Sequence, residues 1–227
     1  MLLKQIITEI SKSDEYRELK LADNGSASIE GVSPASFPFL ISAIFNSTNE
    51  QILVITDNTE HLNDLYTDLT CFIDEQYLFR FPSWETIPYE FMAPTEQSER
   101  DRITSLYRII SGEPAVFITT IDAVMRKIPA RNFFMKKGLT LSVNEEYPFD
   151  DIISTLVQYG YTRETRVDAF GHFSVKGSII DVYLPTKENP VRIAFFGDTL
   201  DSIREFDADS QVSFPGDEID FITVYTR

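Results

Sequence analysis

The spacing of apolar residues in the first half of the chain predicts short strands that alternate with amphipathic helices. Short, mainly apolar runs, typical of buried strands, occur at 51–56, 77–82 and 114–120. Segments with apolar residues every three or four positions predict helices at 2–10, 15–22, 36–46, 58–73 and 95–110. Strands separated by helices favour right-handed βαβ units, so the pattern predicts an α/β domain with a parallel sheet.

The pattern changes near residue 125. One further helix is predicted at 149–160, ending on a glycine. Short strands without helices between them then follow at 162–168, 172–177, 178–184, 190–196 and 201–207. We therefore predict an α/β domain over 1–124, an inserted α+β domain with a helix on an antiparallel sheet over 125–212, and a strand within 213–227 that returns to the first domain's sheet.

The charge of the chain is strongly acidic and unevenly distributed. The 227 residues carry a formal net charge of −16. Residues 125–204 hold 11 Lys and Arg against 10 Asp and Glu, a balance of +1, whereas the remainder holds 9 against 26, a balance of −17. The acidic excess disfavours loose binding to nucleic acid, and the contrast predicts two bodies with different partners.

The cysteine and histidine content and the length of the apolar runs bear on the cellular location, on metal binding and on membrane insertion. A single cysteine favours a reducing, cytoplasmic location, and two histidines with one cysteine disfavour a zinc site. No apolar run is long enough for a membrane-spanning helix, so we expect neither a metal nor a membrane partner.

The stretch "GVSPASFPFL" at 31–40 lies where a nucleotide-binding α/β domain keeps its phosphate loop. Gly31 falls on the first glycine of that motif, but Ser36, Phe37 and Pro38 replace its second glycine, its lysine and its Mg²⁺-binding hydroxyl. We therefore predict a degenerate loop with no catalytic residue, in which Phe37 and Phe39 pack inward and Pro38 also serves only packing. The competing hypothesis is a non-standard loop that still binds ATP.

Cations on the second body's strands are the better candidates for binding. Alternation places Phe173 on one face of its strand and Lys176 on the other. If the strands are neighbours, Arg163, Lys176 and Arg192 project from one sheet face that would attract an acidic partner. These residues alone leave open whether that partner is a protein or a nucleic acid.

Three segments carry a family resemblance. "FPSWETIPYEFMAPTEQSERDRITSLYRI", "GHFSVKGSIIDVYLP" and "VRIAFFGDTLDSIREFDADSQ" resemble the N-terminal module of the bacterial transcription-repair coupling factor family (Mfd), which is itself similar to the excision-repair protein UvrB. The resemblance runs from about residue 31 to residue 211. It implies a degenerate RecA/P-loop-like domain that has lost its ATP site and carries an inserted UvrA-binding domain.

The resemblance also implies a role in nucleotide excision repair. Members of the family recognise RNA polymerase stalled at a DNA lesion, displace it by ATP-driven translocation on DNA, and recruit UvrA. The motor domains, with their ATP and Mg²⁺, and the polymerase-binding domain belong to other parts of the family's chain. We therefore expect this chain to be a non-enzymatic recruiting module without a cofactor. The alternative is an ATP- or DNA-binding domain of a UvrB-like helicase.

Site residues carry over position by position. Arg163 and Lys176 fall where UvrB-like proteins place arginines that contact UvrA, and Arg192 matches the arginine of the "VRIAFFGD" block. Ser174 and Ala194 depart from the UvrB pattern, where an arginine and a glutamate stand. Because lysine also replaces a bidentate guanidinium at 176, the resemblance implies either a weaker contact or one that rests more on Phe173 or Arg166.

Overall fold

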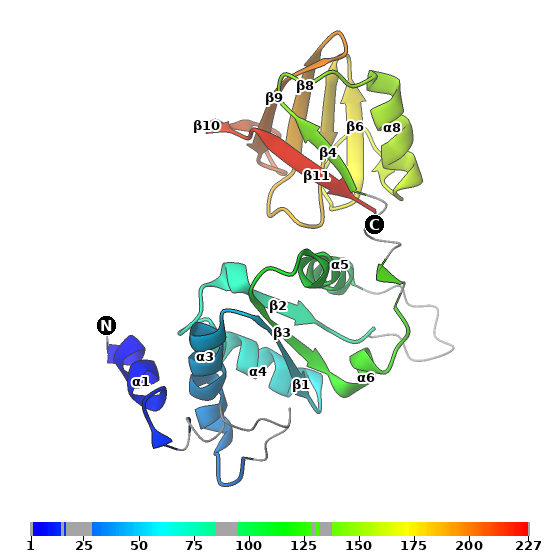
Figure 1. The fold of residues 1–227 in the computed structure, drawn as a ribbon. Helices are drawn as coiled ribbons and strands as arrows, with labels where there is room; N and C mark the ends of the chain where they lie inside the picture. The colour runs from blue at the N-terminus through cyan, green and yellow to red at the C-terminus, as the bar shows by residue number, and fades with distance from the viewer. Residues whose placement is uncertain are drawn as a thin grey trace. The chain divides into compact units, whose positions relative to one another are not determined.

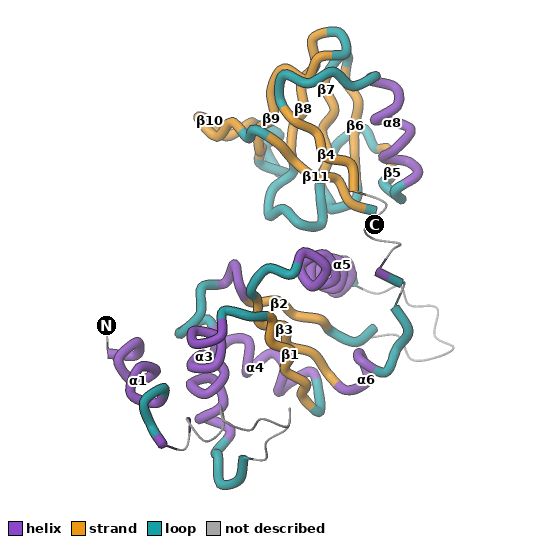
Figure 2. The backbone as a smooth tube through the Cα atoms, viewed as in Figure 1, coloured by secondary structure: helices purple, strands orange, loops and turns teal. Residues whose placement is uncertain are grey.

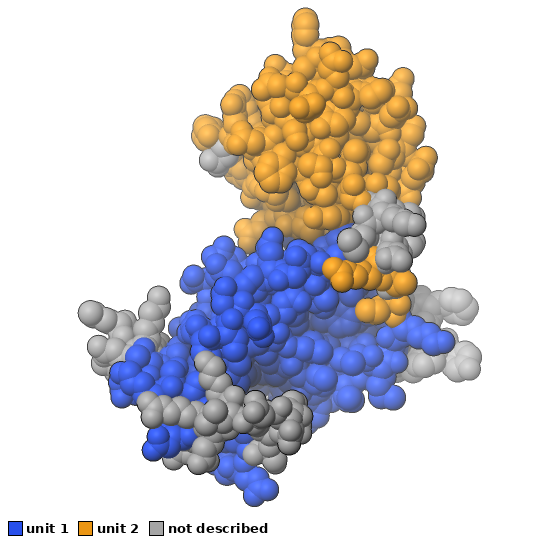
Figure 3. Space-filling model, viewed as in Figure 1, with its two compact units in different colours: residues 1–127 blue, residues 128–227 orange. Residues whose placement is uncertain are grey.

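The chain divides into two compact units, residues 1–127 and 128–227 (Figure 3). The computed structural model describes residues 2–14, 16, 29–84, 95–128, 130–131 and 138–226; most of the helix predicted at 15–22 lies outside this range. No helix within the described residues is long and apolar enough to cross a membrane. The division falls close to the predicted domain boundary at 124/125.

Unit 1 is built on a parallel sheet, as the alternating pattern predicts. Its three described strands are β1 (Gln51–Thr56), β2 (Leu78–Phe81) and β3 (Ala115–Thr120), in the order β1-β3-β2. Both pairings are parallel, with Gln51 opposite Ala115 and Leu78 opposite Val116. Every residue of β3 is buried, as expected for the central strand of a sheet covered on both faces.

Helices cover both faces of this sheet (Figure 1). The unit contains the helices α1 (Leu2–Ile10), α3 (Phe37–Thr48), α4 (Thr59–Leu69), α5 (Glu96–Ser111) and α6 (Ile121–Val124), with 3-10 turns at Pro34–Ser36 and Glu75–Tyr77. Side chains of α3 and α4, among them Phe45 and Leu62, pack with Val116 and Ile118 of β3. The opposite face meets α5, whose Arg102 stacks 4.0 Å from the ring of Phe81.

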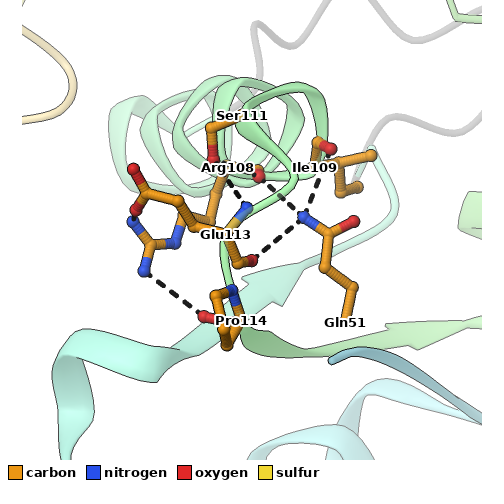
Figure 4. A network of polar contacts seen from close by, with 6 residues as sticks. All are labelled: Gln51, Arg108, Ile109, Ser111, Glu113 and Pro114. Carbon is orange, nitrogen blue, oxygen red and sulfur yellow. Dashed lines mark hydrogen bonds and ion pairs between the residues drawn. The ribbon is translucent and has the colours of Figure 1, made fainter. Parts of the chain in front are cut away.

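A polar network fastens the end of α5 to the start of β1 (Figure 4). The Gln51 side-chain amide donates hydrogen bonds to the carbonyl oxygens of Arg108, Ile109 and Glu113, at 3.0, 3.2 and 3.1 Å. Arg108 pairs with the Glu113 carboxylate and also donates to the carbonyl of Pro114. Carbonyls at a helix C-terminus have no partner within the helix, so one glutamine satisfies the end of α5 and fixes the turn into β3.

Unit 2 contains the antiparallel sheet that the second half of the chain predicts. Six strands lie in the order β10-β9-β8-β7-β6-β5, and all neighbours are antiparallel except β5 and β6. Their bounds are β5 Thr162–Arg163, β6 His172–Lys176, β7 Ile179–Val182, β8 Val191–Phe196, β9 Thr199–Phe206 and β10 Ser213–Glu218. A two-stranded sheet of β4 (Gly138–Ser142) and β11 (Phe221–Tyr225) accompanies it (Figure 2).

One face of the six-stranded sheet carries the core of unit 2. Helix α8 (Phe149–Gln158) contributes Ile152 and Leu156, and the small sheet contributes Leu141 and Val224. The buried side chains that the sheet sends into this core are Phe173, Ile180, Val182, Val191, Ile193, Phe195, Leu200 and Ile203. Their alternation along each strand leaves the other face to the polar residues between them.

The strand expected to return to the first domain's sheet pairs elsewhere. In β11, Phe221 lies opposite Ser142 and Tyr225 opposite Gly138, so its partner is β4 of unit 2. Ile222 and Val224 point into the unit 2 core beside Leu141. The prediction for 213–227 was therefore wrong for the described strand, because the buried alternate positions of β11 complete the nearer core and its backbone pairs with β4.

Candidate functional site

A row of polar side chains crosses the face of the six-stranded sheet opposite the core. Residues paired across neighbouring strands point to the same face. Asp181 of β7 lies between Ser174 of β6 and Arg192 of β8, and Arg192 also lies opposite Arg204 of β9. Arg204 in turn pairs with Glu218 of β10, its Nη2 lying 2.5 Å from a carboxylate oxygen. The row thus contains two cross-strand ion pairs.

The inner ion pair is bidentate and deeply placed. Arg192 donates from Nε and Nη2 to the two carboxylate oxygens of Asp181, at 2.7 and 3.0 Å. The Asp181 side chain is 1% exposed and that of Arg192 is 26% exposed. Hydrogen bonding to Asp181 raises the pKa of Arg192 above its ordinary value, so the guanidinium is charged at every physiological pH.

The turn after β9 covers this pair. Arg192 donates to the carbonyl oxygen of Gln211 at 3.4 Å and to the hydroxyl of Ser213 at 3.2 Å, and its guanidinium lies 4.7 Å from the ring centre of Phe206. The side-chain amide of Gln211 donates a hydrogen bond to the backbone carbonyl of Val167, which ties the turn to the segment between β5 and β6. Arg192 was predicted to project outward toward a partner. It does lie on the face opposite the core, but the expectation that it is available to a partner was wrong, because Asp181 and the 207–213 turn use its hydrogen-bonding capacity.

Arg166 is exposed but is also tied to the same turn. Its Nη2 donates to the carbonyl oxygens of Ala208, at 3.1 Å, and of Asp209. Both contacts are to backbone oxygens at the surface, where water competes for the same donors. Arg166 can therefore exchange these bonds for a partner's acceptors at small cost, which Arg192 cannot do.

Phe173 lies on the face opposite Lys176, as alternation predicted, but neither Phe173 nor Arg163 is placed as the expected partner contact requires. Phe173 is fully buried in the core beneath α8, so it has no surface to offer a partner. Arg163 lies opposite Phe173 in the β5–β6 pairing, whereas Lys176 is three positions further along β6, on the alternate side. The expectation that Arg163, Lys176 and Arg192 share one face was therefore wrong.

Two cations of unit 2 are nevertheless available for binding. Arg163 and Lys176 are both exposed, and among the described residues neither side chain has a hydrogen bond or ion pair, although both backbones take part in the sheet. They lie along the β5–β6 margin of the sheet, and β5 pairs with β6 only at His172 and Phe173. Lys176 is consequently at an open edge of the sheet, and the two side chains form a cationic edge with no internal partner.

The degenerate loop in unit 1 is shaped as a helix entry. Gly31 has φ +75°, a conformation that favours glycine, and the Ser33 and Ser36 hydroxyls are 2.9 Å apart. Ser36 precedes α3 without a capping hydrogen bond from its side chain. Pro38 is buried as expected, but Phe37 is 43% exposed, contrary to the inward packing predicted for it. An exposed apolar ring stands where a phosphate loop needs an ammonium group.

Asp181 is the residue of this face that sequence reasoning missed, and its role is to hold Arg192 in a buried ion pair. It sits in "SIIDVYL", between apolar residues and on the strand next to Arg192. A carboxylate inside an otherwise apolar strand is costly to bury without a cation, so the pattern contained a signal for an ion pair. The pairing register needed to choose Arg192 as its partner was not available from the sequence.

Comparisons with known proteins agree with this division of the chain. Residues 139–227 match the family model described as the UvrB interaction domain. The chain is 31% identical over 221 residues to the transcription-repair-coupling factor of Staphylococcus aureus (strain USA300), and 30% identical over 217 residues to that of Bacillus subtilis (strain 168). These matches cover 96% and 93% of this chain but only 19% and 18% of the two relatives. The chain is thus similar to a stretch of transcription-repair-coupling factor that makes up less than a fifth of that protein, and its residues 139–227 match the UvrB interaction domain.

Proposed function

We propose that this chain is a non-catalytic recruiting module of nucleotide excision repair, in which unit 2 binds UvrA. The observation that carries the proposal is the cationic edge of Arg163 and Lys176 in the unit that matches the UvrB interaction domain, where both side chains are exposed and unpaired among the described residues. Two unpaired cations in a chain of net charge −16 favour a partner surface rich in carboxylates. Arg166 lies close enough in sequence to contribute once it leaves the 207–213 turn.

The parent activity belongs to the same proposal. By likeness to its relatives, the chain would work within a longer, cytoplasmic protein that displaces stalled RNA polymerase by ATP-driven translocation on DNA. RNA polymerase, DNA, ATP and Mg²⁺ would be bound by other parts of that protein. In this view unit 1 is a RecA-type domain that has kept its parallel sheet as a scaffold and lost its phosphate chemistry.

Direct titration with UvrA tests the proposed function. Purified chain titrated with Bacillus subtilis UvrA should show saturable binding that weakens roughly tenfold as sodium chloride rises from about 50 to about 300 mM, since exposed charge pairs are screened by salt. Fluorescence anisotropy of the labelled chain measures this. Absence of saturable binding at the lower salt concentration would refute the proposal.

We expect unit 1 to bind no nucleotide. The loop at 31–38 offers an exposed phenyl ring in place of a lysine, and Pro38 has no backbone N–H to donate to a phosphate. A fluorescent ATP analogue with Mg²⁺ should show no saturable binding up to about 1 mM, a range that excludes any affinity stronger than about −4 kcal/mol. Micromolar binding that is abolished by Phe37→Glu would establish the competing hypothesis of a non-standard ATP site.

A further inference from the structure

Phe196 is the most exposed large apolar side chain of unit 2 among the described residues, with 84% of its surface accessible. It ends β8, at the tip of the hairpin that leads through Gly197 and Asp198 into β9. The preceding residue, Phe195, is buried and meets the ring of Phe149 edge-on at 5.2 Å. Of these two consecutive phenylalanines, Phe195 therefore belongs to the core and Phe196 is exposed to solvent.

The hairpin that presents Phe196 is held rigidly. The Asp198 carbonyl accepts a hydrogen bond from the Tyr147 backbone N–H at 2.8 Å, and Leu200 N–H donates to the carbonyl of Glu145 at 2.9 Å. On its other side, Phe195 N–H donates to the carbonyl of Ser178 in the neighbouring hairpin at 2.9 Å. Phe196 therefore cannot fold back into the core without breaking backbone hydrogen bonds on both flanks.

The two hairpin tips form an open surface that also includes Lys176. Lys176 lies opposite Ile179, and Ile179 lies opposite Ala194, two residues before Phe196. A strand spacing of about 4.8 Å and a rise of about 3.4 Å per residue put the Cα atoms of Lys176 and Phe196 roughly 12 Å apart. At both turn glycines, Gly177 and Gly197, an added Cβ would meet no atom within 4 Å. The surface around both tips is therefore unobstructed by the described chain.

We propose that Phe196 is the apolar anchor of the docking surface whose charged margin is Lys176, and that the partner presents an apolar pocket with a carboxylate at its rim. The inference rests on the proposed function and adds to it the residue that supplies most of the short-range contact. A rigid aromatic side chain loses little conformational freedom when it is buried by a partner, whereas an exposed lysine contributes mainly to encounter and orientation.

The test compares two matched phenylalanine deletions in the titration with UvrA. Phe196→Ala is expected to weaken binding about tenfold or more without changing the salt dependence, because no charge is removed. Phe221→Ala removes the same ring from another exposed position, 62% accessible, on the small sheet formed with β4, and should change the affinity less than about twofold. Phe196→Leu should recover part of the loss, as expected for apolar contact.

The outcomes separate the inference from the function on which it rests. Equal affinities for the wild-type chain and Phe196→Ala would overturn the inference and leave UvrA binding standing. Equal losses in Phe196→Ala and Phe221→Ala would also overturn it, since they would indicate a non-specific apolar effect. No binding by the wild-type chain would overturn both. Concentration-dependent self-association abolished by Phe196→Ala would assign the ring to a second copy of this chain, and would contradict the proposed partner.

Discussion

The double variant Arg163→Glu, Lys176→Glu is expected to bind UvrA at least about 100-fold more weakly than the wild-type chain. Both side chains are exposed and have no partner within the described part of the chain, so their replacement removes attractive contacts with UvrA and places carboxylates against its acidic surface. Like charges brought together in an interface cost several kcal/mol, which corresponds to this loss or more. Because neither residue stabilises the fold through an ion pair, the thermal midpoint of the variant should change little.

A matched variant separates the site from the overall charge. Arg126→Glu with Lys127→Glu makes the same change in net charge on exposed residues of unit 1. Its affinity for UvrA should stay within about threefold of the wild-type value, since exposed charges outside the interface are screened at physiological salt. Equal losses in the two double variants would mean that net charge, and not the cationic edge, governs binding.

The second large effect concerns stability and not binding. Arg192→Ala leaves the Asp181 carboxylate, 1% exposed, without its cation, and is expected to destabilise unit 2 by about 3–5 kcal/mol. Asp181→Ala should cost less, because Arg192 is 26% exposed and can turn its guanidinium toward water. The double variant Asp181→Leu, Arg192→Met, which replaces both charges with apolar groups of similar size, should recover most of the loss.

Urea unfolding, followed by tryptophan fluorescence and by circular dichroism, measures the loss of stability and shows in which unit it occurs. Trp84, the one tryptophan of the chain, belongs to unit 1, so its fluorescence reports on that unit. Far-ultraviolet circular dichroism reports on both units. We expect the loss in Arg192→Ala to appear in the dichroism transition. A loss below about 1 kcal/mol would show that the Asp181 pair is not a structural element of unit 2.

The buried ion pair of Arg192 determines how a charge reversal at this residue is interpreted. From the sequence, Arg192 looks equivalent to Lys176, since both alternate with apolar residues on predicted strands of one sheet. In the structure one is a bidentate partner of a buried carboxylate and the other is free. Loss of UvrA binding after changing Arg192 would therefore follow from unfolding of unit 2 and would carry no information about the interface.

Alternation along a strand predicts which face a side chain occupies but not what covers that face. The pattern of "VRIAFF" correctly placed Val191, Ile193 and Phe195 in the core. It could not indicate that the 207–213 turn folds over Arg192. That contact depends on Gln211, whose backbone adopts a left-handed conformation with φ +60°, and no glycine at this position signals such a turn in the sequence. The parallel and antiparallel sheets were thus predictable, and the covering of the polar face was not.

Strand pairing over long sequence separation was the other limit of prediction. The segment with β11 reads as a half-buried strand, and the exposed Phe221 and buried Ile222 fit that pattern. Its partner, β4, lies about 80 residues earlier and is equally short, so several registers and several sheets satisfy the same alternation. Packing in the core of unit 2 selects the pairing of β11 with β4, because Ile222 and Val224 fill space there beside Leu141.

Hydrogen exchange of the chain at saturating UvrA tests the central claim most directly, because it reports where the partner lies as well as whether it binds. We predict slower exchange in the peptides that contain β5, β6 and the hairpin tips at 177–178 and 197–198, with no change in β1 or β3 of unit 1. Slower exchange confined to unit 1, or none anywhere at saturation, would contradict the assignment of UvrA binding to unit 2.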